Sequence, residues 1–282
     1  KKHSDRARRP LVGVLDGCTQ NAETIGRVSG WNKLADQYGF YVLYPQQKFL
    51  NNHNGCFDWF KKKDITKNKG EVYSIKSMVD LAIDTFLIDT NKIFVYGLSA
   101  GAAMGVALLA DYPEIFNAGA LLAGAPFRSS SNSINGLISM VSPKGKTAKE
   151  LAEPVMLQNP DYKNKYPRII IFHGKNDPVV NIKNAYQLVQ QWTFLHLTDT
   201  IPDSTIHSFE KQPDITKYFY RDSLKNNVVI FYEVNHHGHN LMIDPGEEID
   251  KGGQTGIFAV DKGFYSTYWI AVDFGLINVE RH

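Results

Sequence analysis

The chain has 282 residues, of which 43% are hydrophobic and 12% aromatic, a composition that supports a sizeable core and a single domain over residues 1–282. The 31 Lys and Arg residues nearly balance the 29 Asp and Glu residues. The resulting net charge of +2 argues against nucleic acid or an anionic membrane as a partner. No apolar stretch approaches the ~20 residues that a membrane span requires.

The N-terminal segment, residues 1–10, is basic and has no apolar run behind it, so no signal peptide is visible. We expect this segment to be flexible and the first strand to begin at Leu11. Either a leader has been removed or the chain has been shortened.

Apolar strand patterns and amphipathic helix patterns then alternate along the chain. The first hundred residues predict strands at 11–15, 40–44 and 93–96, helices at 31–38 and 74–85, and a long polar loop at 46–70. A helix of small residues at 100–110 and strands at 118–123, 168–172 and 228–234 follow. Strands separated by helices predict an α/β fold, with a mostly parallel central sheet and helices on both faces.

The most informative motif is the pentapeptide from Gly97 to Gly101, GLSAG, which follows an apolar strand and precedes a helix. A Gly-x-Ser-x-Gly turn in this context exposes its serine at the apex, so Ser99 is the candidate nucleophile. The alternative is a chance match in a turn. A serine hydroxyl is weak until a base takes its proton, and in this fold the acid and the histidine follow the serine along the chain.

The candidate acid is Asp177, in the loop that leaves the strand at 168–172. This loop lies at the carboxyl edge of the sheet, where the active sites of open α/β sheets are found. Asp177 would orient the imidazole and stabilise the imidazolium. The alternative is an aspartate that only shapes an Asp-Pro turn. Asp199 and Asp203 are later candidates, but neither follows so clear a strand.

Three histidines follow the last predicted strand, between His236 and His239. We assign His239 as the general base, because Gly238 before it lets the loop bend inward. We expect His236 and His237 to be a satisfied structural residue and a solvent-facing one. The cluster also raises the possibility of a metal site, but no further ligand stands at a suitable spacing, so we expect no metal and no other cofactor.

The oxyanion hole requires two backbone N–H groups. One is expected from Ala100, directly after the nucleophile. The other is expected from Cys18, in the loop after the first strand, where Gly17 frees the backbone.

Taken together, these motifs resemble the polyhydroxybutyrate depolymerase family of esterases, relatives of the feruloyl and acetylxylan esterases. The resemblance rests on the elbow, the acid and histidine loops, and the segments at 17–20 (GCTQ), 55–60 (GCFDWF) and 252–269. It implies an α/β-hydrolase fold, a Ser99–Asp177–His239 triad and an oxyanion hole formed by the Cys18 and Ala100 amides.

The resemblance also implies that Cys18 and Cys56 are bonded to each other. A disulfide would fit a secreted or periplasmic protein. Two buried free thiols in a cytoplasmic protein are the alternative.

The chain departs from the family pattern at Asp16, where the family usually has histidine. A carboxylate aimed into an oxyanion hole would oppose the developing negative charge. We therefore expect Asp16 to point away and to hydrogen-bond locally. The family also often has strands before the one at Leu11, which would leave the edge of the sheet incomplete here.

The candidate substrate-binding residues are Trp59, Phe57 and Asp16. Together with Phe60, the two aromatic residues either anchor the long loop in the core or, if exposed, form an apolar rim for an acyl chain or polymer strand. No linker or second module follows the catalytic domain, so we expect short oligomers or amorphous polymer rather than crystalline granules as substrate.

The leading hypothesis is a serine esterase that hydrolyses short-chain hydroxyalkanoate esters, polyhydroxybutyrate or its oligomers, through an acyl-enzyme. A feruloyl or acetylxylan-type carbohydrate esterase is the alternative within the same chemistry, and a peptidase is a third. From a different class, the chain could be a non-catalytic binding protein on the same scaffold. The expected partner is a polyester or small ester; the sequence does not indicate the oligomeric state.

Overall fold

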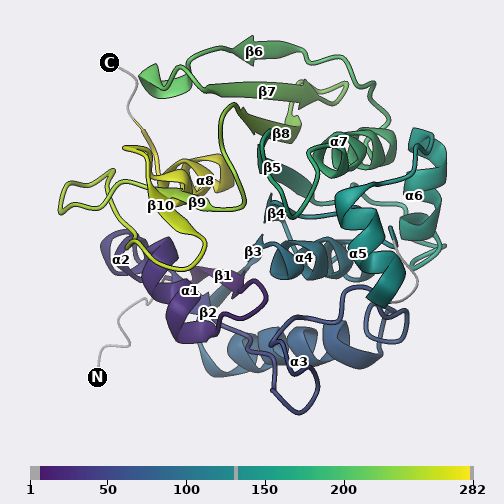
Figure 1. The fold of residues 1–282 in the computed structure, drawn as a ribbon. Coiled ribbons are helices and arrows are strands. Elements are labelled where there is room, and N and C mark those ends of the chain that lie inside the picture. The colour runs from purple at the N-terminus through teal and green to yellow at the C-terminus, as the bar shows by residue number, and fades with distance from the viewer. Residues whose placement is uncertain (1–6, 130–132, 280–282) are drawn as a thin grey trace.

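The computed structural model describes residues 7–129 and 133–279. Its centre is an eight-stranded sheet with the order β2-β1-β3-β4-β5-β8-β7-β6, and helices cover both of its faces (Figure 1). The strands are β1 (Arg9–Leu15), β2 (Tyr41–Leu43), β3 (Ile88–Leu98), β4 (Ala118–Leu122), β5 (Arg168–Gly174), β6 (Ser204–Ile206), β7 (Ile215–Arg221), β8 (Asn227–Val234), β9 (Leu241–Ile243) and β10 (Ala259–Asp261). The helices are α1 (Ala22–Ser29), α2 (Trp31–Tyr38), α3 (Gly70–Thr85), α4 (Ala100–Asp111), α5 (Ser133–Val141), α6 (Ala148–Met156), α7 (Lys183–Leu195) and α8 (Ser266–Phe274).

The sheet is parallel from β2 to β8, and β7 and β6 add an antiparallel edge. Strands β9 and β10 form a separate parallel pair. The α/β prediction is confirmed. Because the carboxyl ends of parallel strands meet at one edge, the loops after β1, β3, β5 and β8 are brought to the same side of the molecule.

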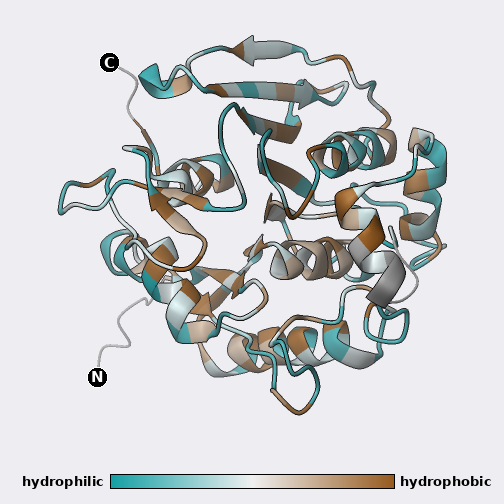
Figure 2. Ribbon diagram, in the orientation of Figure 1, coloured by the Kyte–Doolittle hydropathy of each residue, from teal (hydrophilic) through white to brown (hydrophobic). Residues whose placement is uncertain are grey.

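Two hydrophobic cores sandwich the sheet, which explains why its central strands are near-continuous apolar runs. One core lies under α3, α4, α6 and α7, and the other under α1, α2 and α8. The hydropathy colouring in Figure 2 shows the apolar residues gathered on the strands and the inner sides of the helices.

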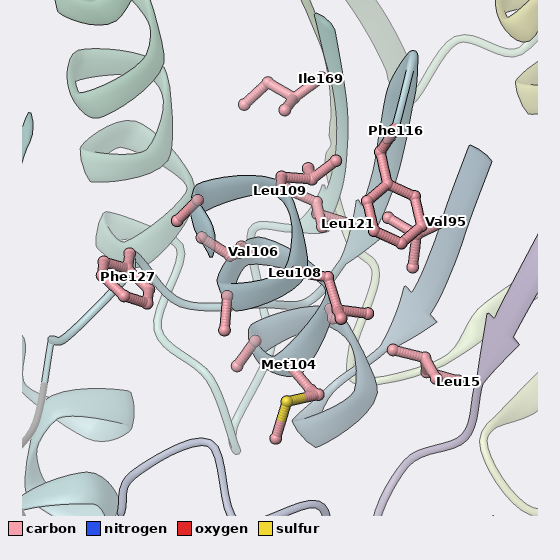
Figure 3. Close-up of a cluster of buried hydrophobic side chains, with 14 of the residues drawn as sticks. Leu15, Val95, Met104, Val106, Leu108, Leu109, Phe116, Leu121, Phe127 and Ile169 are labelled. Atoms are coloured by element: carbon pink, nitrogen blue, oxygen red, sulfur yellow. The ribbon is translucent and has the colours of Figure 1, made fainter. Parts of the chain in front are cut away.

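Helix α4 is buried along its whole length, and Figure 3 shows its apolar side chains packed against the sheet. Its small residues allow the close approach: a Cβ at Gly105 would lie 3.3 Å from a methyl carbon of Leu121 on β4. On the same helix, Leu109 belongs to the core cluster that includes Val95 and Ile169 of the sheet. The helix that begins directly after Ser99 is therefore rigidly anchored.

Several elements that the sequence patterns did not predict are present. Helix α8 is apolar on most of its surface because it is buried on most sides, so it lacks the amphipathic period that marks a surface helix. Strand β7 alternates only imperfectly between buried and half-buried residues, and β6, β9 and β10 have three residues each. Short strands carry too few residues for a pattern to identify them.

The expected flexible segment at 1–10 is corrected at Arg9 and Pro10, which belong to a strand. Residues 1–6 lie outside the described part of the chain. Strand β1 begins at Arg9 rather than Leu11. The Arg9 amide donates to the carbonyl of Leu87 at 2.8 Å, and the Arg8 guanidinium donates to the carbonyl of Ile88 at 3.2 Å. Strand β3 also starts earlier than predicted, at Ile88, and gives β1 a longer partner.

Candidate active site

Ser99 lies at the turn between β3 and α4, with a backbone φ of 55° and ψ of −116°, which side-chain-bearing residues rarely adopt. A Cβ at Gly97 would lie 2.3 Å from the Gly101 carbonyl oxygen, and one at Gly101 would lie 2.4 Å from the Asp16 carbonyl oxygen. Only glycine fits at either position. The Ser99 amide donates to the Leu122 carbonyl at 2.8 Å, whereas its hydroxyl bonds to no other described residue. The serine is thus fixed to the sheet with its hydroxyl available.

Asp177 and His239, which are 62 residues apart in sequence, meet at the carboxyl edge of β5 and β8. Nδ1 of His239 lies 2.7 Å from Oδ2 of Asp177. The other carboxylate oxygen accepts the amides of Val179 and Val180, both at 2.8 Å. When Nδ1–H donates to Asp177, the opposite ring nitrogen, Nε2, is left to accept a proton.

The electrostatics keep Asp177 charged. Burial by itself would raise the pKa of its carboxyl, but the hydrogen bond and charge of His239 and the amides of Val179 and Val180 outweigh burial and hold the pKa below its usual value. The adjacent His173 is buried, and burial lowers its pKa. Neutral His173 donates from Nε2 to the Val180 carbonyl at 2.7 Å. This bond holds the backbone of the loop that carries Asp177.

The acid loop and the histidine loop are joined through their backbones. The Asn176 amide donates to the His237 carbonyl at 3.0 Å, and the Lys175 amide donates to the Val234 carbonyl at 2.8 Å. A Cβ at Gly174 would lie 2.3 Å from the same His237 oxygen. The pairing of β5 with β8 therefore sets the distance between the carboxylate and the imidazole.

The other two histidines take the expected pair of roles in reversed order. His237 is the buried, structural one: its Nε2 lies 2.8 Å from the Asn240 carbonyl, and burial lowers its pKa. His236 is exposed and lies 3.0 Å from a carboxylate oxygen of Asp214. The reversal follows from the backbone, since His236 has a φ of 50° at the outward turn of the loop. Over residues 7–129 and 133–279, no group of three or more His, Cys, Asp or Glu side chains is placed to hold a metal ion.

The loop after β1 leaves one of its amides free. The Gly17 amide donates to the Gln20 side chain at 3.1 Å, the Thr19 amide to the Asn54 carbonyl at 2.8 Å, and the Gln20 amide to the Gly17 carbonyl at 3.2 Å. The Cys18 amide bonds to no described residue. Gly17 faces the nucleophile, because a Cβ on it would lie 3.5 Å from the Cβ of Ser99. The free amide therefore belongs to the loop beside the serine.

The second candidate donor, the Ala100 amide, is the first of α4. The first amides of a helix have no partner within it, and the helix dipole adds partial positive charge there. The Cys18 and Ala100 amides, which the sequence predicts for the oxyanion hole, thus have no hydrogen-bond partner within their own loop or helix.

The predicted disulfide between Cys18 and Cys56 is confirmed, and it closes a separation of 38 residues. It joins the loop after β1 to the long segment between β2 and α3, as does the bond from Thr19 to Asn54. This segment contains no helix or strand, as predicted for most of 46–70, so these bonds fix it at the site.

The expectation that Asp16 hydrogen-bonds locally is wrong. The side chain is only 1% exposed, and neither carboxyl oxygen has a partner at hydrogen-bonding geometry. Burial raises the pKa of Asp16 to about 7, with a smaller opposing effect from its own backbone amide. The carboxyl avoids charge by staying protonated below that pH, so it opposes an oxyanion less than an ionised aspartate would.

The structure also bears on the aromatic residues proposed for an exposed rim. Phe57 and Trp59 are 3% and 7% exposed and belong to the core cluster under α3 and α4. They therefore anchor the long loop in the core and do not form an exposed rim. Ile257 is 58% exposed, and its carbonyl accepts a hydrogen bond from Gln20 in the loop after β1, a contact that sequence reasoning missed. The segment at 252–269 was identified only through the family resemblance, and no local sequence pattern indicates that it folds back beside Gln20.

A comparison with protein families finds that the family described as Esterase PHB depolymerase matches residues 3–208. Poly(3-hydroxyalkanoate) depolymerase C of Paucimonas lemoignei is 35% identical over 274 residues, covering 96% of this chain and 64% of that protein. Feruloyl esterase B of Talaromyces stipitatus is 30% identical over 262 residues, covering 89% of this chain and 70% of that protein. A probable acetylxylan esterase A of Aspergillus fumigatus is 34% identical over 195 residues, covering 64% of this chain and 50% of that protein.

Solved structures agree on the fold. An acetyl xylan esterase from Aspergillus awamori superposes with a TM-score of 0.73 at 24% identity, over 82% of this chain and 84% of that chain. A serine hydrolase of Staphylococcus aureus gives a TM-score of 0.52 at 13% identity, over 85% of this chain and 80% of that chain. The α/β-hydrolase fold expected from the sequence is therefore confirmed. No helix in the described part of the chain is long and apolar enough to cross a membrane.

Proposed function

Because the chain belongs to the esterase PHB depolymerase family, we propose that it is a serine esterase that hydrolyses short-chain hydroxyalkanoate esters through an acyl-enzyme. The observation that carries the proposal is the 2.7 Å contact between His239 and Asp177 at the sheet edge where Ser99 occupies a strained turn. An imidazole oriented by a carboxylate, at the same sheet edge as a serine whose hydroxyl is not bonded to another described residue, supports acyl transfer.

In the proposed mechanism, Oγ of Ser99 attacks the ester carbonyl while Nε2 of His239 takes its proton. Asp177 holds the imidazole by Nδ1–H and stabilises the imidazolium. The free amides of Cys18 and Ala100 donate to the oxyanion of the tetrahedral intermediate. The imidazolium then gives its proton to the leaving alcohol, and water, activated by the same histidine, releases the acid from the acyl-enzyme.

The choice of hydroxyalkanoate esters is supported by the extent of the similarity. The match to the poly(3-hydroxyalkanoate) depolymerase covers 96% of this chain, whereas the match to the Aspergillus fumigatus acetylxylan esterase covers 64%. The exposed apolar residue Ile257, whose carbonyl is bonded to Gln20 of the loop after β1, supports a substrate with a short acyl or alkyl group. The disulfide supports an oxidising location, outside the cytoplasm.

The decisive experiment is labelling with a fluorophosphonate probe. We expect the native chain to be labelled and the Ser99→Ala variant not to be. An intact, folded native chain that resists the probe would overturn the proposal and favour a binding protein on the hydrolase scaffold.

A carbohydrate esterase is the second candidate, favoured by the match to feruloyl esterase B over 89% of this chain. Hydrolysis of 3-hydroxybutyrate oligomers, acetylated xylo-oligosaccharides and feruloyl esters, each measured as kcat/KM, separates the two. We expect the hydroxybutyrate oligomers to be the best substrates. A preference for acetyl or feruloyl sugars would replace the substrate class and leave the mechanism standing, and cleavage of an amide would indicate a peptidase.

A further inference from the structure

The side chain of Gln20 joins two parts of the active site that are far apart in sequence. It is 7% exposed. Its Oε1 accepts the Gly17 amide at 3.1 Å, and its Nε2 donates to the Ile257 carbonyl at 2.9 Å, across 237 residues of sequence. A primary amide has one strong acceptor and two donors, so a single side chain can satisfy both backbone groups at once.

The first end of this bridge sets the oxyanion loop. With the Gly17 amide turned onto Gln20, the next peptide along is that of Cys18, whose amide is free. The bond therefore fixes the orientation of the backbone that immediately precedes the proposed oxyanion donor. The same loop has a strained position, since Thr19 has a φ of 66°, and such a conformation persists only where surrounding bonds enforce it.

The second end sets the general base. The residue after Ile257 is Phe258, whose ring meets the imidazole of His239 edge to face, with centroids 5.5 Å apart and planes at 84°. The Phe258 carbonyl accepts the amide of Leu241, two residues beyond His239, at 2.7 Å. Phe258 also has a φ of 59°, so its segment too is held in a conformation that it would not adopt alone.

We propose that Gln20 is a positioning residue, which holds the oxyanion loop and the wall behind the catalytic histidine at a fixed separation through its bonds to Gly17 and Ile257. This role rests on the proposed function. In acyl transfer the histidine and the oxyanion donors act on the same tetrahedral intermediate, so a shift of about 1 Å between them lowers the rate of the chemical step.

The chain provides a matched control in Gln191 on α7. Its Oε1 accepts the Phe127 amide at 3.1 Å and its Nε2 donates to the Leu151 carbonyl at 2.6 Å, so it also bridges two backbone segments through one buried amide. None of these three residues belongs to the catalytic loops. Replacement by methionine keeps the length of the side chain in both cases and removes both hydrogen bonds.

The experiment compares Gln20→Met and Gln191→Met by thermal melting and by hydrolysis of 4-nitrophenyl butyrate. We expect both variants to melt below the native chain. Only Gln20→Met should lose kcat, by about 10- to 100-fold, with KM within about twofold of the native value. A native-like kcat in Gln20→Met, or an equal loss of kcat in both variants, would refute the positioning role.

A second measurement does not depend on activity. Hydrogen exchange followed by mass spectrometry should show faster exchange in Gln20→Met, relative to Gln191→Met, at both 17–20 and 256–259. Unchanged exchange at either segment would contradict the bridge. If the native chain failed to react with the fluorophosphonate, the proposed function would fall, whereas the exchange result would still decide whether Gln20 connects the two segments.

Discussion

At the scale of single residues, the site depends on ionisable groups that their surroundings push in opposite directions. Asp177 is kept charged by His239 and two amides, whereas burial without a partner raises the pKa of Asp16 to about 7. Both are aspartates at the ends of parallel strands. Their different surroundings, rather than their residue type, move the pKa values of the two carboxyls in opposite directions.

The first prediction concerns Asp177→Asn. The amide cannot stabilise an imidazolium, and it can bond to the ring in the wrong tautomer, with the proton on the nitrogen that should accept from Ser99. We expect kcat to fall by about 10⁴-fold with the fold intact. The measurement is steady-state hydrolysis of an aryl ester together with circular dichroism. A loss of less than tenfold would show that another group orients His239.

The second prediction concerns Asp16 and pH. The pKa of its carboxyl rises from 3.8 to about 7 on folding, so the native state binds a proton that the unfolded state has released between these values. The stability from this proton is complete below about pH 4 and is lost as pH rises through about 7. Because one pKa unit is equivalent to about 1.4 kcal/mol, Asp16→Asn should gain a few kcal/mol over the native chain at pH 8, relative to their difference at pH 4.

Urea denaturation of both proteins at pH 4, 6 and 8 measures this difference. The comparison cancels the contributions of Asp111 and Glu71, whose pKa values burial raises to about 8 and about 7. A difference in the free energy of unfolding that does not change with pH would mean that Asp16 is ionised throughout.

At the scale of elements, the active site consists of loops held by rigid strands. The long segment between β2 and α3 has no helix or strand, and its attachment to the loop after β1 depends on the disulfide and on the bond from Thr19 to Asn54. Buried Phe57 and Trp59 anchor the same segment in the core. The loop that carries the proposed oxyanion donor is thus braced from one side by this segment and from the other by Gln20.

The third prediction tests that bracing with Cys56→Ala, which leaves the Cys18 backbone in place. Removing the cross-link frees a loop of 38 residues in the unfolded state, so stability should fall by about 2–4 kcal/mol. The freed oxyanion loop should also lower kcat. Denaturant melts and ester hydrolysis, each with and without a reductant, provide the measurement. Reductant should lower the stability and kcat of the native chain and leave both quantities unchanged in the variant. Equal sensitivity of the two proteins to reductant would contradict the prediction.

At the scale of the whole molecule, the parallel sheet brings the site together. Ser99, Asp177 and His239 follow β3, β5 and β8. In the sheet only β4 lies between β3 and β5, and β5 pairs directly with β8. Helices on both faces bury the sheet between two hydrophobic cores, so the loops that carry these residues lie at its carboxyl edge. The same architecture places β7 and β6 as an antiparallel edge far from the serine, which loop lengths in the sequence did not indicate.

The sequence alone determined the class of fold, and it predicted the serine turn and the two later loops in which Asp177 and His239 meet. These features depend on local patterns: apolar runs mark buried parallel strands, and glycines at positions 97 and 101 mark a turn that no side chain can enter. Cys18 and Cys56 were paired through the family resemblance, and the structure bears this out.

Only the tertiary structure decided which surfaces the chain exposes and which distant segments meet. Nothing near Phe57 or Trp59 in sequence indicates that both are buried, since burial depends on where a loop packs. The missing partner of Asp16 and the pairing of Gln20 with Ile257 depend on segments brought together by folding. Local patterns report the periodicity of a segment, whereas hydrogen bonds across 237 residues depend on topology, and topology determines the neighbours of the serine.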